Sequence, residues 1–127
     1  MINSISISDT EKEVMEVLWY SSPLTASQIT SSIQKEREMH PNTVKTLLNR
    51  LVKKQVVSYK EEGRKFLYYP LVARETFYHS QTERFLDQFY GGRVSSLISH
   101  FAENERLSDD EVEQIKTLIK KMEQSDE

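Results

Sequence analysis

Residues 41–54 read PNTVKTLLNRLVKK, a stretch in which apolar and polar side chains alternate in a regular pattern. Its apolar side chains recur at the spacing i, i+3, i+4, i+7 and i+8, namely Val44, Leu47, Leu48, Leu51 and Val52. That spacing places all of them on one face of a helix. Proline at the start of the stretch suits the first turn of a helix, where its missing N–H is not needed. The stretch therefore predicts an amphipathic helix over about 41–54 with a buried apolar face.

The opposite face of this predicted helix is polar and basic, and it carries Asn42, Lys45, Thr46, Asn49, Arg50 and Lys53. No aspartate or glutamate occurs in residues 41–54, although the chain holds 20 acidic residues. A helix that only needs to be soluble usually mixes both signs of charge. A helix that lies against phosphates should avoid carboxylates. The pattern favours contact with a polyanion over an ordinary solvated surface.

The segments around this helix predict a winged helix-turn-helix. Capping boxes at Ser8–Glu11 and Thr25–Gln28 predict helices over about 9–20 and 25–35. Two β-branched and aromatic runs follow, and they flank a turn at 60–64 that contains a glycine, which predicts a hairpin. In this plan the third helix takes the recognition position and the hairpin is the wing.

The remaining part of the chain predicts three further helices, over about 72–90, 93–103 and from residue 109 onward. These helices are one-sided, and about 55 residues cannot bury such apolar stripes alone, so a second copy in a two-fold dimer is the expected partner. The fold class is mainly α, with a winged-helix domain over 1–70 and an all-α dimerisation domain over 71–127. The residues expected at the dimer contact are Phe85, Phe89, Val94, Leu97, Ile98, Phe101, Val112, Ile115, Ile119 and Met122.

Side-chain chemistry assigns the polar residues to double-stranded DNA. Amides and hydroxyls near the helix N-terminus can meet base edges in the major groove, and lysines and arginines suit phosphates. The net charge is −3, but residues 45–65 hold seven basic residues against two glutamates, and such a local patch can bind a polyanion. The predicted DNA-binding residues are Asn42, Thr43, Lys45, Thr46, Asn49, Arg50, Lys53 and Lys54 in the helix, with Lys60, Arg64 and Lys65 in the wing.

The amino-acid composition narrows the classes of protein to which this chain can belong. The chain contains no cysteine, which excludes disulfides, thiolate metal sites and cysteine nucleophiles. Its apolar runs are too short to span a bilayer, and its N-terminus lacks the pattern of a signal peptide. We expect a cytoplasmic protein without a cofactor.

Three rival functions have weaker support. An enzyme is suggested only by Ser32-Ile33-Gln34-Lys35, a Ser-x-x-Lys match without its companion motifs. A metal site would need histidines that are far apart in the sequence (His40, His79 and His100), and no pair has the spacing of a structural zinc site. A winged helix that binds protein instead of DNA is the main alternative. The carboxylate-free face of residues 41–54 disfavours it.

Five stretches in order resemble the penicillinase and methicillin-resistance repressor family, the BlaI/MecI group, which also includes copper-operon repressors. They are ISDTEKEVMEVLW, PNTVKTLLNRLVKK, EEGRKFLYYPLV, FLDQFYGGRVSSLISHF and LSDDEVEQIKTLI, and the likeness extends over nearly the whole chain. The resemblance implies a homodimeric repressor that binds palindromic operators through two winged-helix domains. It implies control of β-lactamase, penicillin-binding protein or copper-export genes.

The resemblance also implies how such a repressor is induced. Where lactams are the signal, a membrane metalloprotease triggers cleavage in the dimerisation domain, commonly at an Asn-Phe bond. The matching bond here is His100-Phe101, in which the phenylalanine fits the family pattern and the histidine departs from it. The copper branch uses paired cysteines, which this chain lacks. The family's recognition helix commonly ends in Lys-Lys-Gly, and here Gln55 stands in place of that glycine.

Overall fold

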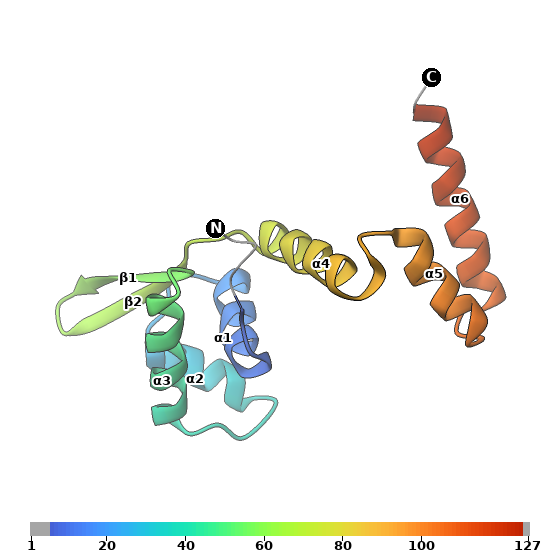
Figure 1. Cartoon of the computed structure of the whole chain (residues 1–127). Coiled ribbons are helices and arrows are strands. Elements are labelled where there is room, and N and C mark those ends of the chain that lie inside the picture. Colours follow the sequence, from blue (N-terminus) through green and yellow to red (C-terminus); the bar gives the residue numbers. More distant parts are fainter. Residues whose placement is uncertain (1–5, 126–127) are drawn as a thin grey trace. The chain divides into compact units, whose positions relative to one another are not determined.

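The computed structural model describes residues 6–125, which form six helices and one two-stranded antiparallel hairpin (Figure 1). The elements in chain order are α1 (Asp9–Tyr20), α2 (Ala26–Gln34), α3 (Pro41–Lys53), β1 (Val57–Glu62), β2 (Lys65–Pro70), α4 (Arg74–Tyr90), α5 (Val94–Glu103) and α6 (Asp109–Ser125). The chain divides into two compact units, the first ending at Gln81 and the second beginning at Thr82. The element order confirms the predicted fold class, a three-helix winged domain followed by helices.

The first two helices begin at the predicted capping boxes. The Ser8 hydroxyl oxygen accepts a hydrogen bond from the Glu11 N–H at 3.1 Å, and the Glu11 carboxylate accepts one from the Ser8 N–H at 3.0 Å. Thr25 and Gln28 repeat this exchange at 3.1 and 2.9 Å. Each box satisfies N–H groups that have no partner inside the helix, which explains why α1 and α2 begin at these residues.

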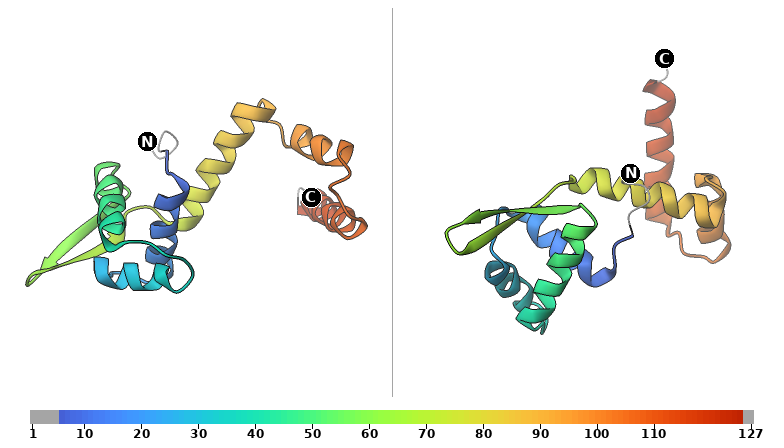
Figure 2. Two further views of the ribbon diagram at one scale, coloured as in Figure 1. Left: turned by 90° about the horizontal axis from the view of Figure 1, so that it is seen from below. Right: turned by 60° about the vertical axis from the view of Figure 1, so that its left-hand side comes forward.

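The core of the first unit lies among α1, α2 and α3, and the hairpin extends beyond them (Figure 2). Of the predicted apolar stripe of α3, Val44, Leu47, Leu48 and Leu51 are buried and only Val52 is half-buried. Against them pack the fully buried side chains of the other two helices, which include Val14, Met15, Leu18 and Ile29. This packing holds α3 in one orientation, with its polar face directed outward.

The hairpin is longer and its turn is tighter than the sequence predicted. The strands pair from Val57 with Pro70 to Glu62 with Lys65, so only two residues form the turn, instead of the predicted 60–64. Gly63 takes the first of these two positions with a φ of +65°, which suits the type II′ turn that demands glycine there. The predicted bounds of the turn were wrong because charged residues such as Lys60 were assigned to the turn. In the structure these residues belong to β1 and pair with residues of β2.

The first unit continues past residue 70, where the sequence placed its boundary, to Gln81. The indole N–H of Trp19 donates to the Val72 carbonyl at 2.8 Å, and its ring centroid lies 5.5 Å from that of Phe77. The Tyr78 hydroxyl donates to the Glu16 carboxylate at 2.6 Å. These contacts fasten the start of α4 to α1, so the first turns of α4 belong to the winged domain.

The residue after the C-cap of α3 offers a test of backbone strain. Gln55 has a φ of +65°, in the left-handed region. A side chain costs about 1–2 kcal/mol in that region, and glycine usually takes this place at a helix end. We expect Gln55→Gly to raise the free energy of unfolding by about 0.5–1 kcal/mol, because the entropy of glycine in the unfolded chain offsets part of the relief. Urea unfolding measures the change.

The matched control for this substitution is Gln55→Ala, which removes the amide but keeps a Cβ in the left-handed region. We expect no stabilisation from it. A glycine variant that is no more stable than the alanine variant would show that the backbone at this position stores no strain.

The second unit buries few of its own apolar side chains. Among the described residues from Thr82 onward, Leu86 is the only apolar side chain that is almost completely buried, at 5% exposure. Large apolar groups remain exposed on all three of its helices, and they include Phe89 and Met122 at 67%. Gly91, with a φ of +58°, ends α4, and the Ser108 hydroxyl caps α6 at 3.2 Å from the Glu111 N–H. No helix within residues 6–125 has the length and apolar character that a membrane span requires.

Candidate nucleic-acid interface

The outer face of α3 displays the polar residues that the sequence singled out. The His40 side chain caps the helix, because its Nδ1 accepts a hydrogen bond from the Asn42 N–H at 3.0 Å. The Thr46 hydroxyl donates to the Asn42 carbonyl at 3.0 Å, so its oxygen keeps lone pairs for an outside donor. All the predicted residues of this face are exposed, namely Asn42, Thr43, Lys45, Thr46, Asn49, Arg50 and Lys53.

A cleft of about 410 Å³ lies between α3, the hairpin and the start of α2, and we call it the wing cleft. Two predicted DNA-binding residues of α3 and two of the hairpin meet there, although more than ten residues separate the two pairs in the chain. Its lining residues are Thr25, Ala26, Ser27, Lys45, Asn49, Arg64, Lys65, Phe66 and Tyr68. The tertiary structure therefore brings four of the predicted side chains into one site.

The electrostatics of the wing cleft favour an anion. No carboxylate lines it, and neither α2 nor α3 carries an acidic residue in its first turn. The N-terminus of α2 lines this cleft through Thr25, Ala26 and Ser27, and the positive end of a helix dipole favours an anion nearby. Burial, with a smaller contribution from Tyr59, raises the pKa of Tyr68 above its usual value of 10.0, so this wall of the cleft stays uncharged near neutral pH.

The sequence did not predict that residues at the start of α2 line this site. Leu24, just before the helix, forms a bridge to Tyr68 in β2, with N–H to carbonyl distances of 3.0 and 2.7 Å. This bridge places the N-terminus of α2 beside the wing. The capping box at Thr25 did signal a helix N-terminus, but no local pattern could signal which element lies opposite it.

Two features of the hairpin also differ from expectation. Lys60 pairs across the strands with Leu67, so it lies on the hairpin face opposite to Tyr59, Phe66 and Tyr68, and it does not line the wing cleft. The rings of Tyr59 and Phe66 stack at 4.6 Å between centroids, and both side chains are 41% exposed. The alternation of side chains along the strands indicates this aromatic face, but only basic residues of the hairpin were predicted to bind DNA.

Lys54 is a further predicted DNA-binding residue that does not line the wing cleft. Its ammonium lies 2.8 Å from both carboxylate oxygens of Glu11, and it donates to the Ser6 carbonyl at 2.7 Å. Glu11 is only 3% exposed. A lysine held in this way ties α3 to the start of α1, and we leave it out of the proposed DNA contacts.

The Glu11–Lys54 pair predicts a pH dependence of stability. Burial would raise the pKa of Glu11, but hydrogen bonds from Lys54 and Ser8 outweigh burial and hold the pKa below its usual value of 4.5. A carboxyl group with a lowered pKa in the folded state stabilises the fold above its unfolded pKa, and this stability is lost as the pH falls through the folded pKa. The free energy of unfolding should therefore decrease as the pH falls below 4.5.

Glu11→Gln tests this contribution. We expect a loss of about 1–3 kcal/mol at neutral pH, because a hydrogen-bonded charge pair is broken. The loss should shrink at acidic pH, as the wild-type carboxyl itself becomes protonated. Urea unfolding at neutral and at acidic pH measures it, with the exposed Glu38→Gln as control. A deficit of equal size at both pH values would contradict the assignment.

The residues predicted to make the dimer contact lie on all three helices of the second unit. The Phe85 and Phe89 ring centroids are 5.2 Å apart near the end of α4. On α5 and α6 the predicted side chains are half-buried or exposed, and they comprise Val94, Leu97, Ile98, Phe101, Val112, Ile115, Ile119 and Met122. Leu118, at 58% exposure, adjoins this stripe and was not predicted. The His100-Phe101 bond lies within α5.

The three-helix core, the hairpin and the basic outer face define a winged-helix protein. Residues 7–121 match the model of the family described as penicillinase repressor. The chain is 33% identical over 113 residues to the penicillinase repressor of Bacillus licheniformis, which covers 89% of this chain and 88% of that protein. It is 35% identical over 115 residues to the methicillin resistance regulatory protein MecI of Mammaliicoccus sciuri, covering 91% and 94%. The chain therefore belongs to the penicillinase repressor family, as its resemblance predicted.

Two solved structures are similar to the winged part of the chain. One is the solution structure of the DNA-binding domain of the repressor BlaI, with a TM-score of 0.52 and 34% identity, covering 60% of this chain and 90% of that one. The other is the monomeric form of Bacillus licheniformis BlaI in complex with the blaP half-operator. It has a TM-score of 0.50 and 35% identity, and the match covers 57% of this chain and 88% of that one.

Proposed function

We propose that this chain is a transcriptional repressor that binds a palindromic DNA operator as a homodimer. The observation that carries the proposal is the wing cleft, which unites Lys45, Asn49, Arg64 and Lys65 without a carboxylate. Phosphates of a DNA backbone are the anions that such a cleft beside a recognition helix would meet. The names of the relatives and the half-operator complex of a similar protein support this function.

The positions of the side chains divide their roles. Asn42, Thr43, Thr46, Asn49 and Arg50 would face base edges, and the Thr46 oxygen can accept a hydrogen bond from a base amino group. Lys45 and Lys53 on α3, with Arg64 and Lys65 on the hairpin, would contact phosphates, together with the first N–H groups of α2. Lys60, on the other face of the hairpin, would contribute charge at longer range.

The exposed apolar side chains of the second unit support the homodimer. A surface that presents Phe89, Leu118, Ile119 and Met122 at 50–67% exposure is unfavourable in water. A second copy would cover the same patch on both chains through a two-fold axis. That axis would place the two α3 helices about one helical turn of DNA apart, roughly 34 Å, or a multiple of it.

The family resemblance extends the proposal to the regulated genes and to induction. We propose control of β-lactam or metal resistance genes in the cytoplasm, with an inducing protease as a further partner. The His100-Phe101 bond would be the cleaved bond, and it lies in the last two turns of α5. Because a helical backbone is already hydrogen-bonded, cleavage there would require local unfolding of α5 first.

Selection from a random DNA pool with the purified full chain tests the proposal. We expect enriched sequences with two inverted half-sites at a constant spacing. The logarithm of the binding constant should fall linearly with the logarithm of the salt concentration, by about 0.9 for each phosphate contact. A pool without enriched sequences would overturn the proposal and favour a winged helix that binds protein.

A further inference from the structure

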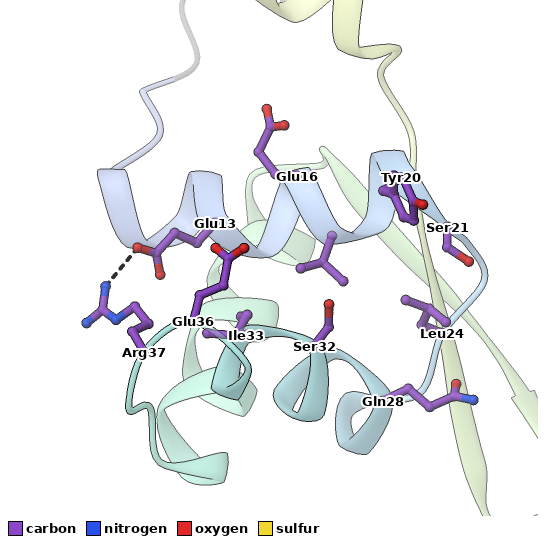
Figure 3. A pocket seen from close by; sticks show the side chains of 11 residues that line it. Glu13, Glu16, Tyr20, Ser21, Leu24, Gln28, Ser32, Ile33, Glu36 and Arg37 are labelled. Atoms are coloured by element: carbon purple, nitrogen blue, oxygen red, sulfur yellow. Dashed lines mark hydrogen bonds and ion pairs between the residues drawn. The ribbon is translucent and has the colours of Figure 1, made fainter.

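A second hollow lies on the first unit, between α1 and α2, with a volume of about 660 Å³ (Figure 3). We call it the α1–α2 groove. Apolar side chains of Val17, Leu24 and Ile33 line it, and the aromatic ring of Tyr20 lies at its edge with 93% of the side chain exposed. Its volume is in the range of small-molecule sites, about 300–1,000 Å³. Such sites are also lined mainly by apolar side chains.

The polar groups of the α1–α2 groove carry an excess of negative charge. The carboxyl groups of Glu13 and Glu36 both lie between the two helices (Figure 3). Arg37 donates to Oε1 of Glu13 at 2.8 Å, whereas Oε2 of Glu13 is buried and accepts no hydrogen bond from the described residues. Glu36 belongs to none of the ion pairs formed within residues 6–125.

Glu16 also lines the α1–α2 groove, but its carboxylate is already hydrogen-bonded to residues that do not line the groove. Its carboxyl group points away from α2 (Figure 3), where it accepts hydrogen bonds from Tyr78 and Arg74 at 2.6 and 3.3 Å. The charge that faces the groove therefore consists of two carboxylates and one guanidinium. One negative charge in the groove has no counter-charge among the residues that line it.

We propose that the α1–α2 groove binds an organic cation with an apolar body. Its ammonium group would lie between the carboxylates of Glu13 and Glu36 and donate to Glu36, which forms no ion pair within residues 6–125. Its apolar body would cover Val17, Leu24 and Ile33 and extend toward the Tyr20 ring, which lies at the end of the groove away from Glu13 and Glu36 (Figure 3). Glu36 would repel an anion, and a neutral molecule would leave the charge unbalanced.

The proposed ligand site is separate from the proposed DNA site. The α1–α2 groove and the wing cleft share no lining residue, because α2 contributes Gln28, Ser32 and Ile33 to the former and Ala26 and Ser27 to the latter. The inference therefore does not depend on DNA binding, and each can fail without the other.

Titration of the isotope-labelled full chain by NMR tests the inference. The probe is tryptamine, and tryptophol and indole-acetate present the same ring with a neutral and a negative group. We expect saturable shifts for tryptamine at Val17, Tyr20, Leu24 and Ile33, with a Kd of about 0.1–1 mM as befits a small ligand. The two analogues should bind more weakly by about tenfold or more.

Substitutions then locate the charge that recognises the probe. Glu36→Gln removes an exposed carboxyl group and should weaken tryptamine binding about tenfold without affecting the fold. Glu38→Gln, which removes the same charge two positions further along and outside the groove, should leave the affinity unchanged. The absence of saturable shifts, equal binding of tryptophol, or an unchanged affinity in Glu36→Gln would each overturn the inference.

Discussion

Replacing Ile119 with aspartate should separate the dimer into monomers. Ile119 lies in the apolar stripe of α6 and is 50% exposed in the single chain. In the proposed dimer a second copy would bury it, and a carboxylate without a partner in that position is costly. The monomer should keep its fold, because half of this side chain already faces water.

Sedimentation of the wild type and of Ile119→Asp measures this effect at matched concentrations. The control is Thr117→Asp, which adds the same charge to α6 on the face opposite the stripe and should leave the dimer intact. Since two linked winged domains gain affinity from binding together, the monomer should also bind a palindromic operator at least about a hundredfold more weakly. A dimer that persists in Ile119→Asp would remove this residue from the contact.

Reversing the charge of Lys45 should give the largest loss of DNA affinity of any single substitution on α3. Lys45 lines the wing cleft, where basic side chains of the hairpin converge with the start of α2. Glutamate at this position would remove a charge-assisted contact with phosphate and add repulsion. We expect the affinity to fall by about a hundredfold or more. The slope of the logarithm of the binding constant against the logarithm of the salt concentration should decrease by the contribution of about one phosphate contact.

The control for this reversal is Lys120→Glu, which changes the net charge equally but lies on α6 in the second unit. Fluorescence anisotropy with the selected operator at constant salt compares the three proteins. An equal loss in both variants would mean that net charge alone drives binding. Loss in Lys45→Glu alone places the contact in the wing cleft.

Much of the winged fold could be predicted because its signals are local. The capping boxes at Ser8 and Thr25 placed the starts of α1 and α2 correctly. The apolar stripe of residues 41–54 identified the buried face of α3, and Val44, Leu47, Leu48 and Leu51 are buried as predicted. Hydrogen bonds within one helical turn and the helical period depend on residues three or four apart, which a sequence displays directly.

The candidate site was predicted only in part. The predicted DNA-binding residues within α3 and at the hairpin tip are exposed, and the wing cleft unites Lys45 and Asn49 with Arg64 and Lys65. The partner of Lys54 was not foreseen, because Glu11 lies 43 residues away in the chain. The sequence shows that a lysine at the end of a helix is basic, but not which carboxylate it will meet.

The local patterns of the sequence therefore specify the set of elements, the buried face of α3 and the membership of the penicillinase repressor family. Only the tertiary structure decided that the start of α2 faces the wing, through the bridge between Leu24 and Tyr68. It also decided that the winged domain runs on to Gln81, through the contacts of Trp19. Periodicity and capping arise between neighbours in the chain, whereas these contacts join residues more than 40 positions apart, and they form only when the core has packed.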